Sequence, residues 1–65
     1  MSVAKTIELS AISPTSFDDA IREAIAKSGE SLRNIQGAWV KEQKVVIENG
    51  DVHFQVILAL TFVVE

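Results

Sequence analysis

The chain has 65 residues, a net charge of −3 and no cysteine, and 48% of its residues are hydrophobic. This length allows one small domain, residues 1–65, and so short a chain buries only about 60% of the surface that it exposes when unfolded. The lack of cysteine excludes disulfides and thiolate metal sites, and the single histidine excludes a histidine-cluster metal site within one subunit. Oligomerisation is therefore the expected source of additional stability.

The charge distribution and hydropathy also exclude several partners. No basic run or stripe is present, so we expect no nucleic-acid binding. The first residues, MSVAKTIEL, lack the apolar core of a signal peptide. The apolar run over 52–64 is shorter than a membrane span and contains His53, Gln55 and Thr61. These features predict a cytoplasmic protein that does not bind membranes.

A strand and a helix are predicted in the first half of the chain. Residues 3–12 alternate with period two, with Lys5 as the exception on the apolar side, which is typical of a half-buried strand. Ser16 followed by Asp19 resembles a capping box at the start of a helix, and Gly29 is a plausible stop. One apolar helical stripe lies between them, made of Phe17, Ala20, Ile21, Ala24, Ile25 and Ser28.

A long hairpin is predicted in the second half. Asn49-Gly50 favours a two-residue type I′ turn, which places Glu48 opposite Asp51 and Lys44 opposite Gln55. The even positions of the last strand then form one apolar face that covers the helix. Continuing this register would put Gln43 and Lys41 on the core side, so we expect a β-bulge between Lys41 and Lys44. The predicted fold is α+β, of order β-α-β-β, with a three-stranded antiparallel sheet wrapped on one helix.

The predicted bulge turns Trp39 and Gly37 to the side of the sheet away from the helix. That side also carries Ile57, Ala59 and Val63, which are too apolar for free solvent, so other subunits or a ligand must cover it. Trp39 is a flat aromatic and Gln55 an amide that both donates and accepts hydrogen bonds. The pair suits a planar heteroaromatic ligand. Packing at a subunit interface is the alternative role for each.

At this point the sequence resembles the dodecin family over nearly all of its length. The resemblance is carried by SPTSFDDAI, SLRNI, the Asn49-Gly50 turn and HFQVILALTFVVE. It implies a hollow homododecamer with 23 symmetry that sequesters flavins and, in some members, coenzyme A. In flavin-binding members, pairs of flavin rings stack between tryptophans from symmetry-related subunits, and a glutamine on the last strand hydrogen-bonds the ring.

The resemblance assigns roles to particular residues. Gln55 matches the family glutamine, and Lys44 stands where many members have an arginine, in reach of a phosphate tail. Flavin-binding members read W-F-E-V or W-A-E-V after the helix, whereas this chain reads Gly37-Ala38-Trp39-Val40. The stacking position is therefore Gly37, and Trp39 lies on the same face about 7 Å away. The continuation VKEQ is closer to a subgroup without the stacking tryptophan, which includes a calcium-binding member.

We therefore expect a non-enzymatic storage protein that binds riboflavin, FMN or FAD through Gln55, Trp39, Gly37 and Lys44. No nucleophile, base and orienting group converge in the predicted arrangement, which argues against an enzyme. The alternative is a dodecin-like cage without flavin that is structural or binds calcium or other ions. Asp18 and Asp19 are helix-start residues first and calcium ligands second. Instead of meeting a phosphate tail, the Lys44 side chain could be solvated or ion-paired.

Overall fold

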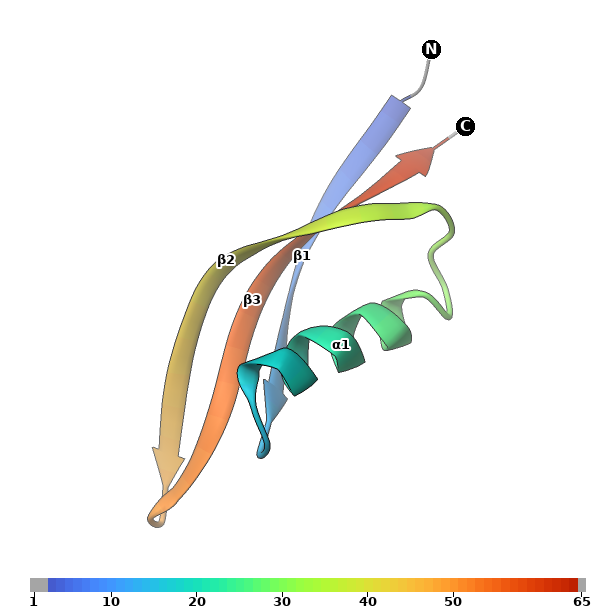
Figure 1. Ribbon diagram of the computed structural model, residues 1–65. Coiled ribbons are helices and arrows are strands. Elements are labelled where there is room, and N and C mark those ends of the chain that lie inside the picture. The colour runs from blue at the N-terminus through green and yellow to red at the C-terminus, as the bar shows by residue number, and fades with distance from the viewer. Residues whose placement is uncertain (1–2, 65) are drawn as a thin grey trace.

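The structure is a computed structural model, and it describes residues 3–64. Strand β1 (Val3–Ser13) leads into helix α1 (Phe17–Ser28), and the long strands β2 (Ile35–Glu48) and β3 (Asp51–Val64) follow. The sheet is antiparallel in the order β1-β3-β2, so β3 is the central strand (Figure 1). This confirms the predicted α+β fold and its β-α-β-β order. In residues 3–64, no helix is both long and apolar enough to cross a membrane.

The start of α1 is held by two serines. The Oγ of Ser16 accepts a hydrogen bond from the backbone N–H of Asp19 at 2.9 Å, as the predicted cap requires. The carboxylate of Asp19 instead accepts a hydrogen bond from the Oγ of the buried Ser13 at 2.7 Å. This bond ties the end of β1 to the first turn of the helix. The helix ends at Ser28, and the N–H of Gly29 donates to the carbonyl of Ile25 at 2.9 Å.

The core lies between α1 and the helix-facing side of β3. Val56, Leu58 and Leu60 are fully buried, which confirms that the even positions of the last strand face the helix. Val56 and Leu58 pack with Ala20 and Ala24 of α1. The apolar helical stripe is not buried uniformly, and Ile25 is 37% exposed. The sheet covers an arc of the helix centred on Ala20 and Ala24, and Ile25 lies at its margin.

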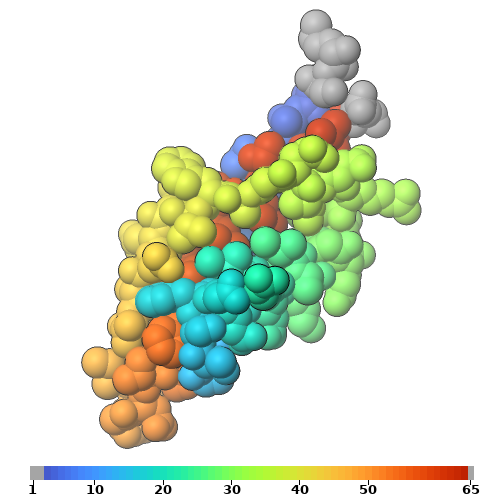
Figure 2. All heavy atoms as spheres, viewed as in Figure 1, coloured from blue at the N-terminus to red at the C-terminus, as the bar shows by residue number. Residues whose placement is uncertain are grey.

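The helix is much shorter than the strands that it covers. Its 12 residues rise about 18 Å, whereas the 14 residues of β3 span about 46 Å. The sheet therefore extends past α1 at both ends, and the β2–β3 hairpin forms an uncovered arm (Figures 1 and 2). The rings of Phe17 and Phe54 meet edge to face, with centroids 5.1 Å apart, at the base of this arm, where the helix begins. The molecule accordingly measures 50 × 20 × 13 Å.

The hairpin has the predicted turn and register. Asn49 and Gly50 have φ of 52° and 82°, the positive values that a type I′ turn requires at both central positions. The ladder pairs Glu48 with Asp51 and continues without a break to the pair of Lys44 and Gln55. Because the side-chain period of a strand is two, this register places Gln55 on the face away from the helix.

The bulge in β2 is confirmed, but its position differs from the prediction. The register shifts between Val40 and Glu42, so the extra residue is Lys41 itself rather than a residue between Lys41 and Lys44. Gln43 remains opposite Val56 on the helix side and is exposed, because β2 is an edge strand and α1 does not cover it there. The Gln43 amide is therefore solvated on the helix side, so the bulge does not have to move Gln43 to the other side of the sheet. A second shift, between Ile35 and Gly37, was not predicted.

Candidate functional site

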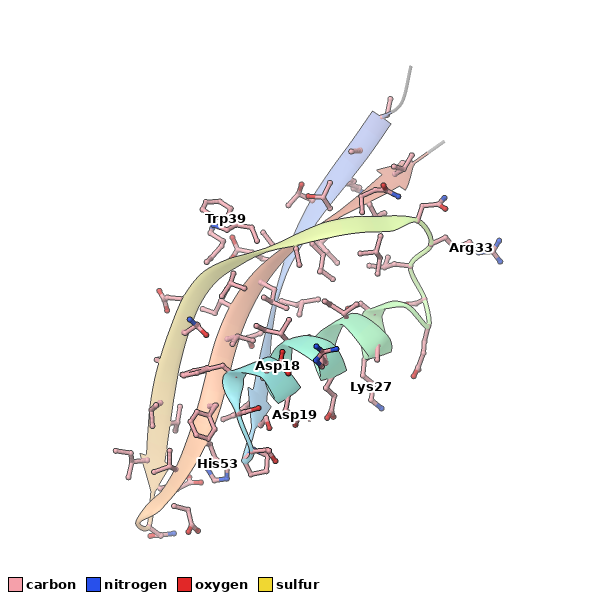
Figure 3. All side chains as sticks on the ribbon, viewed as in Figure 1. Asp18, Asp19, Lys27, Arg33, Trp39 and His53 are labelled. Atoms are coloured by element: carbon pink, nitrogen blue, oxygen red, sulfur yellow. The ribbon has the colours of Figure 1, made fainter. Side chains whose placement is uncertain are left out.

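The candidate site is the outer face, which we define as the side of the sheet away from α1. Val40 pairs with Leu58 and Ala38 with Leu60 on the helix side. Trp39 pairs with Ala59 on the outer face, as predicted. Figure 3 shows the Trp39 ring standing off β2 away from the helix. Trp39, the chain's one tryptophan, is 67% exposed in the subunit, which is a large fraction for so large an aromatic residue.

Ala59 is the middle residue of a row that crosses all three strands. It pairs with Trp39 on β2 and with Glu8 on β1, so the three side chains share one face. The Nζ of Lys41 donates a hydrogen bond to Glu8 Oε2 at 2.6 Å and lies 5.5 Å from the centroid of the Trp39 ring. The ammonium thus makes an ion pair and a cation–π contact at once. Because the side chain of Ala59 is only a methyl group, the Lys41 side chain can cross over β3 to reach Glu8.

Gln55 lies on the same outer face but in another row. It pairs with Lys44 on β2 and with Ile12 on β1, whose side chain is 55% exposed. Within residues 3–64 the amide of Gln55 makes no side-chain hydrogen bond, and the residue is half-buried. Its donor and acceptor therefore remain available to a ligand or to a neighbouring chain.

The four predicted site residues form two pairs on one face. Gly37 and Trp39 are two residues apart on β2 and therefore neighbours on one face, and a Cβ at Gly37 would meet no atom of a residue other than its chain neighbours within 4 Å. Lys44 and Gln55 are directly opposite in the ladder. The two pairs are separated along β3 by the step of four residues from Gln55 to Ala59, or about 13 Å. One subunit brings the members of each pair together but does not bring the pairs into contact.

Sequence reasoning missed Glu8 and Lys41 at this site. An unbroken register would place Lys41 on the core side, and Glu8 occupies one of the polar positions of an alternating strand. Their proximity could have been found by placing β3 in the centre of the sheet. Glu8 on β1 and Trp39 on β2 both pair with Ala59, so they lie in one row. Their proximity depends on two long-range pairings that neither strand specifies alone.

The acidic residues at the start of α1 are occupied within the subunit. Asp18 accepts a hydrogen bond from Arg22 Nε at 2.9 Å on the exposed face of the helix, and this bond, aided by the carboxylate charge, raises the pKa of Arg22. Asp19 is bound by Ser13. In the described part of the chain, no group of three or more His, Cys, Asp or Glu side chains is placed to hold a metal ion.

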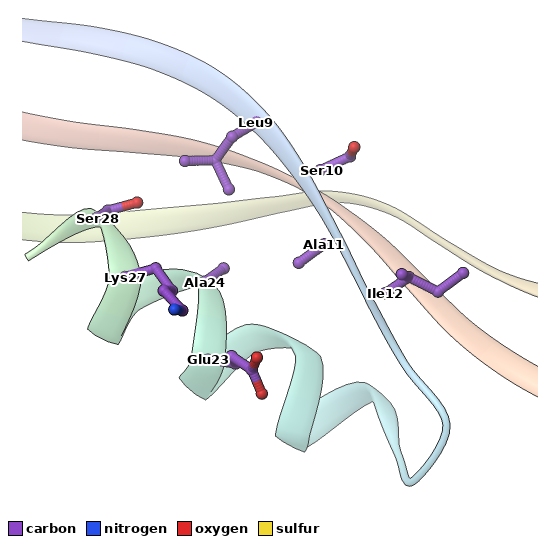
Figure 4. A pocket seen from close by; sticks show the side chains of 8 residues that line it. All are labelled: Leu9, Ser10, Ala11, Ile12, Glu23, Ala24, Lys27 and Ser28. Atoms are coloured by element: carbon purple, nitrogen blue, oxygen red, sulfur yellow. The ribbon is translucent and has the colours of Figure 1, made fainter.

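A groove of about 360 Å³ opens elsewhere, between β1 and α1 (Figure 4). Leu9, Ala11 and Ala24 give it an apolar floor, and Glu23 and Lys27 stand at its rim. None of the four predicted site residues lines it. The groove is therefore distinct from the four predicted site residues, although Ser10 and Ile12 at its β1 edge also belong to the outer face.

Comparisons with known proteins identify the family. The sequence model of the Dodecin family matches residues 3–65. The calcium dodecin of Mycobacterium tuberculosis is 33% identical over 63 residues, which cover 95% of this chain and 89% of that protein. Its crystal structure superposes with a TM-score of 0.90 at 31% identity, covering 98% of this chain and 93% of the other.

Two further solved structures agree with this assignment. Dodecin from Streptomyces coelicolor superposes with a TM-score of 0.92 at 32% identity, covering 98% of this chain and 93% of the other. The tt0972 protein from Thermus thermophilus gives a TM-score of 0.92 at 32% identity, covering 100% and 97% of the two chains. With the family match spanning nearly the whole sequence and the fold shared throughout, this chain belongs to the dodecin family.

Proposed function

We propose that this dodecin is a non-enzymatic binding protein that assembles with copies of itself through the outer face and sequesters a flavin there. The observation that carries the proposal is the 67% exposure of Trp39 on a sheet face that also presents the amide of Gln55, which makes no side-chain hydrogen bond within residues 3–64. An exposed indole offers stacking, and a half-buried amide offers paired donor and acceptor groups, which together suit a flavin ring.

Assembly is part of the proposal because one subunit does not complete the site. The pair of Gly37 and Trp39 lies about 13 Å from the pair of Lys44 and Gln55 along β3. This separation favours a ring that stacks on Trp39 of one copy and meets Gln55 of another. The apolar side chains of the outer face supply a further reason, since a face of this kind is normally covered. A hollow homododecamer is the assembly that we propose.

Calcium binding is the second candidate, favoured by the 33% identity to a protein named calcium dodecin. Within residues 3–64 of one subunit, no acidic cluster meets the needs of a calcium ion, which takes six to eight oxygen ligands. Asp18 and Asp19 are already engaged by Arg22 and Ser13. A calcium site would therefore have to combine carboxylates from several copies in the assembly.

Titration of the purified assembly with riboflavin and FMN, followed by flavin fluorescence, tests the flavin proposal. Gln55→Ala should weaken binding by about 1–2 kcal/mol, or roughly 5- to 30-fold, the scale of one or two lost hydrogen bonds. Gln43→Ala is the matched control, since Gln43 lies on the opposite face of the same sheet. If the parent binds neither flavin while calorimetry detects calcium uptake, the ion-binding cage is the better account.

A further inference from the structure

The bulge in β2 gives the outer face a cation that regular alternation would not supply. Lys41 is the extra residue, flanked by Val40 on the helix side and by Glu42 opposite Ile57 on the outer face. Its ammonium reaches across β3 to Glu8 at 2.6 Å and also lies 5.5 Å from the Trp39 ring centroid. A side chain from one edge strand is thus anchored on the other edge strand, beside the chain's one indole.

The anchor does not saturate the lysine. An ammonium has three N–H donors, of which one is directed at Glu8, so two remain for an acceptor that approaches Trp39. The side chains of Lys41 and Glu8 are 37% and 56% exposed, so the pair can rearrange when a ligand arrives. Because the ammonium lies over the Trp39 ring, a ligand ring that approaches the indole comes close to this positive charge.

We propose that Lys41, positioned by Glu8, is a specificity-determining residue of the Trp39 site that selects planar ligands by charge. Rings with carbonyl or anionic groups at the edge are favoured, and cationic rings are repelled. The inference rests on the proposed function in that the ligand is taken to be a planar ring held on Trp39. This local preference for anions is opposite in sign to the long-range effect of the whole chain, whose net charge of −3 attracts cations.

A ligand-free measurement tests the local charge at the indole. Since the chain has one tryptophan, its fluorescence reports on Trp39 alone. Iodide, caesium and acrylamide are an anionic, a cationic and a neutral collisional quencher. We expect the parent to be quenched better by iodide than by caesium, each taken relative to acrylamide. Lys41→Met should lower the iodide-to-caesium ratio about two- to fivefold, the scale of one unit charge roughly 4–8 Å away in water. Glu8→Gln should raise it, and Lys41→Arg should retain it.

A ligand pair tests the selectivity itself. Riboflavin carries carbonyl acceptors on a neutral ring, whereas proflavine is a planar cationic acridine. Lys41→Met should weaken riboflavin binding, through a lost hydrogen bond, and strengthen proflavine binding, through a lost charge repulsion, each by about two- to fivefold. Glu8→Gln should shift both affinities the other way, because the glutamine oxygen can still accept a hydrogen bond from Lys41 while the negative charge that offsets the ammonium is removed. Lys27→Met is the matched control, since it removes a lysine on α1, away from the outer face.

Three results would overturn the inference. One is an iodide-to-caesium ratio that Lys41→Met leaves unchanged, and another is a Lys41→Met change of the same sign for both dyes. The third is a Trp39 that acrylamide cannot reach in the assembled protein. Failure of the flavin proposal has a different signature, because riboflavin would then not bind while the quencher ratio still responded to Lys41→Met and Glu8→Gln.

Discussion

Trp39 lies directly opposite Ala59 in the β2–β3 ladder, and the two side chains differ sharply in exposure, at 67% and 6%. The alanine is covered because Trp39 stands on one side of it and Glu8 on the other, with Lys41 reaching between them. The indole itself is left open above the sheet. The outer face therefore combines a buried alanine on the central strand with an exposed aromatic ring beside it. This arrangement suits both ring stacking and subunit assembly.

Gly37→Trp should strengthen riboflavin binding if the assembled cavity is otherwise of the flavin type. A Cβ at Gly37 meets no atom within 4 Å, so the new side chain has room, and its ring would lie on the same face as Trp39. A stacked aromatic pair adds about 0.5–1.5 kcal/mol beyond area burial, or roughly 2- to 13-fold in affinity. Fluorescence titration of parent and variant measures the change. A variant that folds and assembles but gains no affinity would show that the cavity has diverged from a flavin site.

Ile57→Lys should disrupt assembly, because it places a charge in the middle of the outer face opposite Glu42 and Ser10. We expect light scattering to report a large assembly for the parent and smaller species for this variant. Ala26→Lys adds the same charge on the exposed side of α1 and is the control. A stable 7.1 kDa monomer for the parent would contradict the assembly proposal directly.

Leu58→Ala should destabilise the fold by about 2–5 kcal/mol, since Leu58 is fully buried between the sheet and α1. The control is Ile47→Ala at a side chain that is 71% exposed on the arm, where we expect a change within about 0.5 kcal/mol. Urea unfolding at one fixed protein concentration gives both values, because oligomer stability depends on concentration. Equal losses for the two variants would mean that the arm is buried in the assembly as deeply as the core.

Ser13→Ala should cost about 1–3 kcal/mol of stability, the desolvation penalty of a buried group that loses its partner. The Ser13 hydroxyl accepts from the N–H of Thr15 at 2.9 Å and donates to Asp19 at 2.7 Å, and the residue is 2% exposed. Ser10→Ala, at an exposed position of the same strand, is the control. Thermal unfolding of the two variants at equal concentration makes the comparison, and a loss as small as that of Ser10→Ala would contradict the role assigned to Ser13.

Local sequence patterns by themselves determined the order of the elements, the helix start at Ser16, the hairpin turn at Asn49-Gly50 and the face of each residue near that turn. Each of these depends on residues close together in the chain, where period two, period 3.6 and turn chemistry act directly. The same patterns determined that Trp39 points away from the helix, because only a bulge reconciles Val40 with the core.

The tertiary structure decided which residue bulges, which helical positions are buried and what surrounds Trp39. The bulge settles on Lys41, whose ammonium reaches Glu8, a residue 33 positions away in the sequence. Ile25 is left exposed because the sheet covers only an arc of α1. The distance between the Trp39 and Gln55 rows follows from the register of both neighbours on β3. These outcomes depend on long-range pairing and on the shape of the covered surface, which no local pattern encodes.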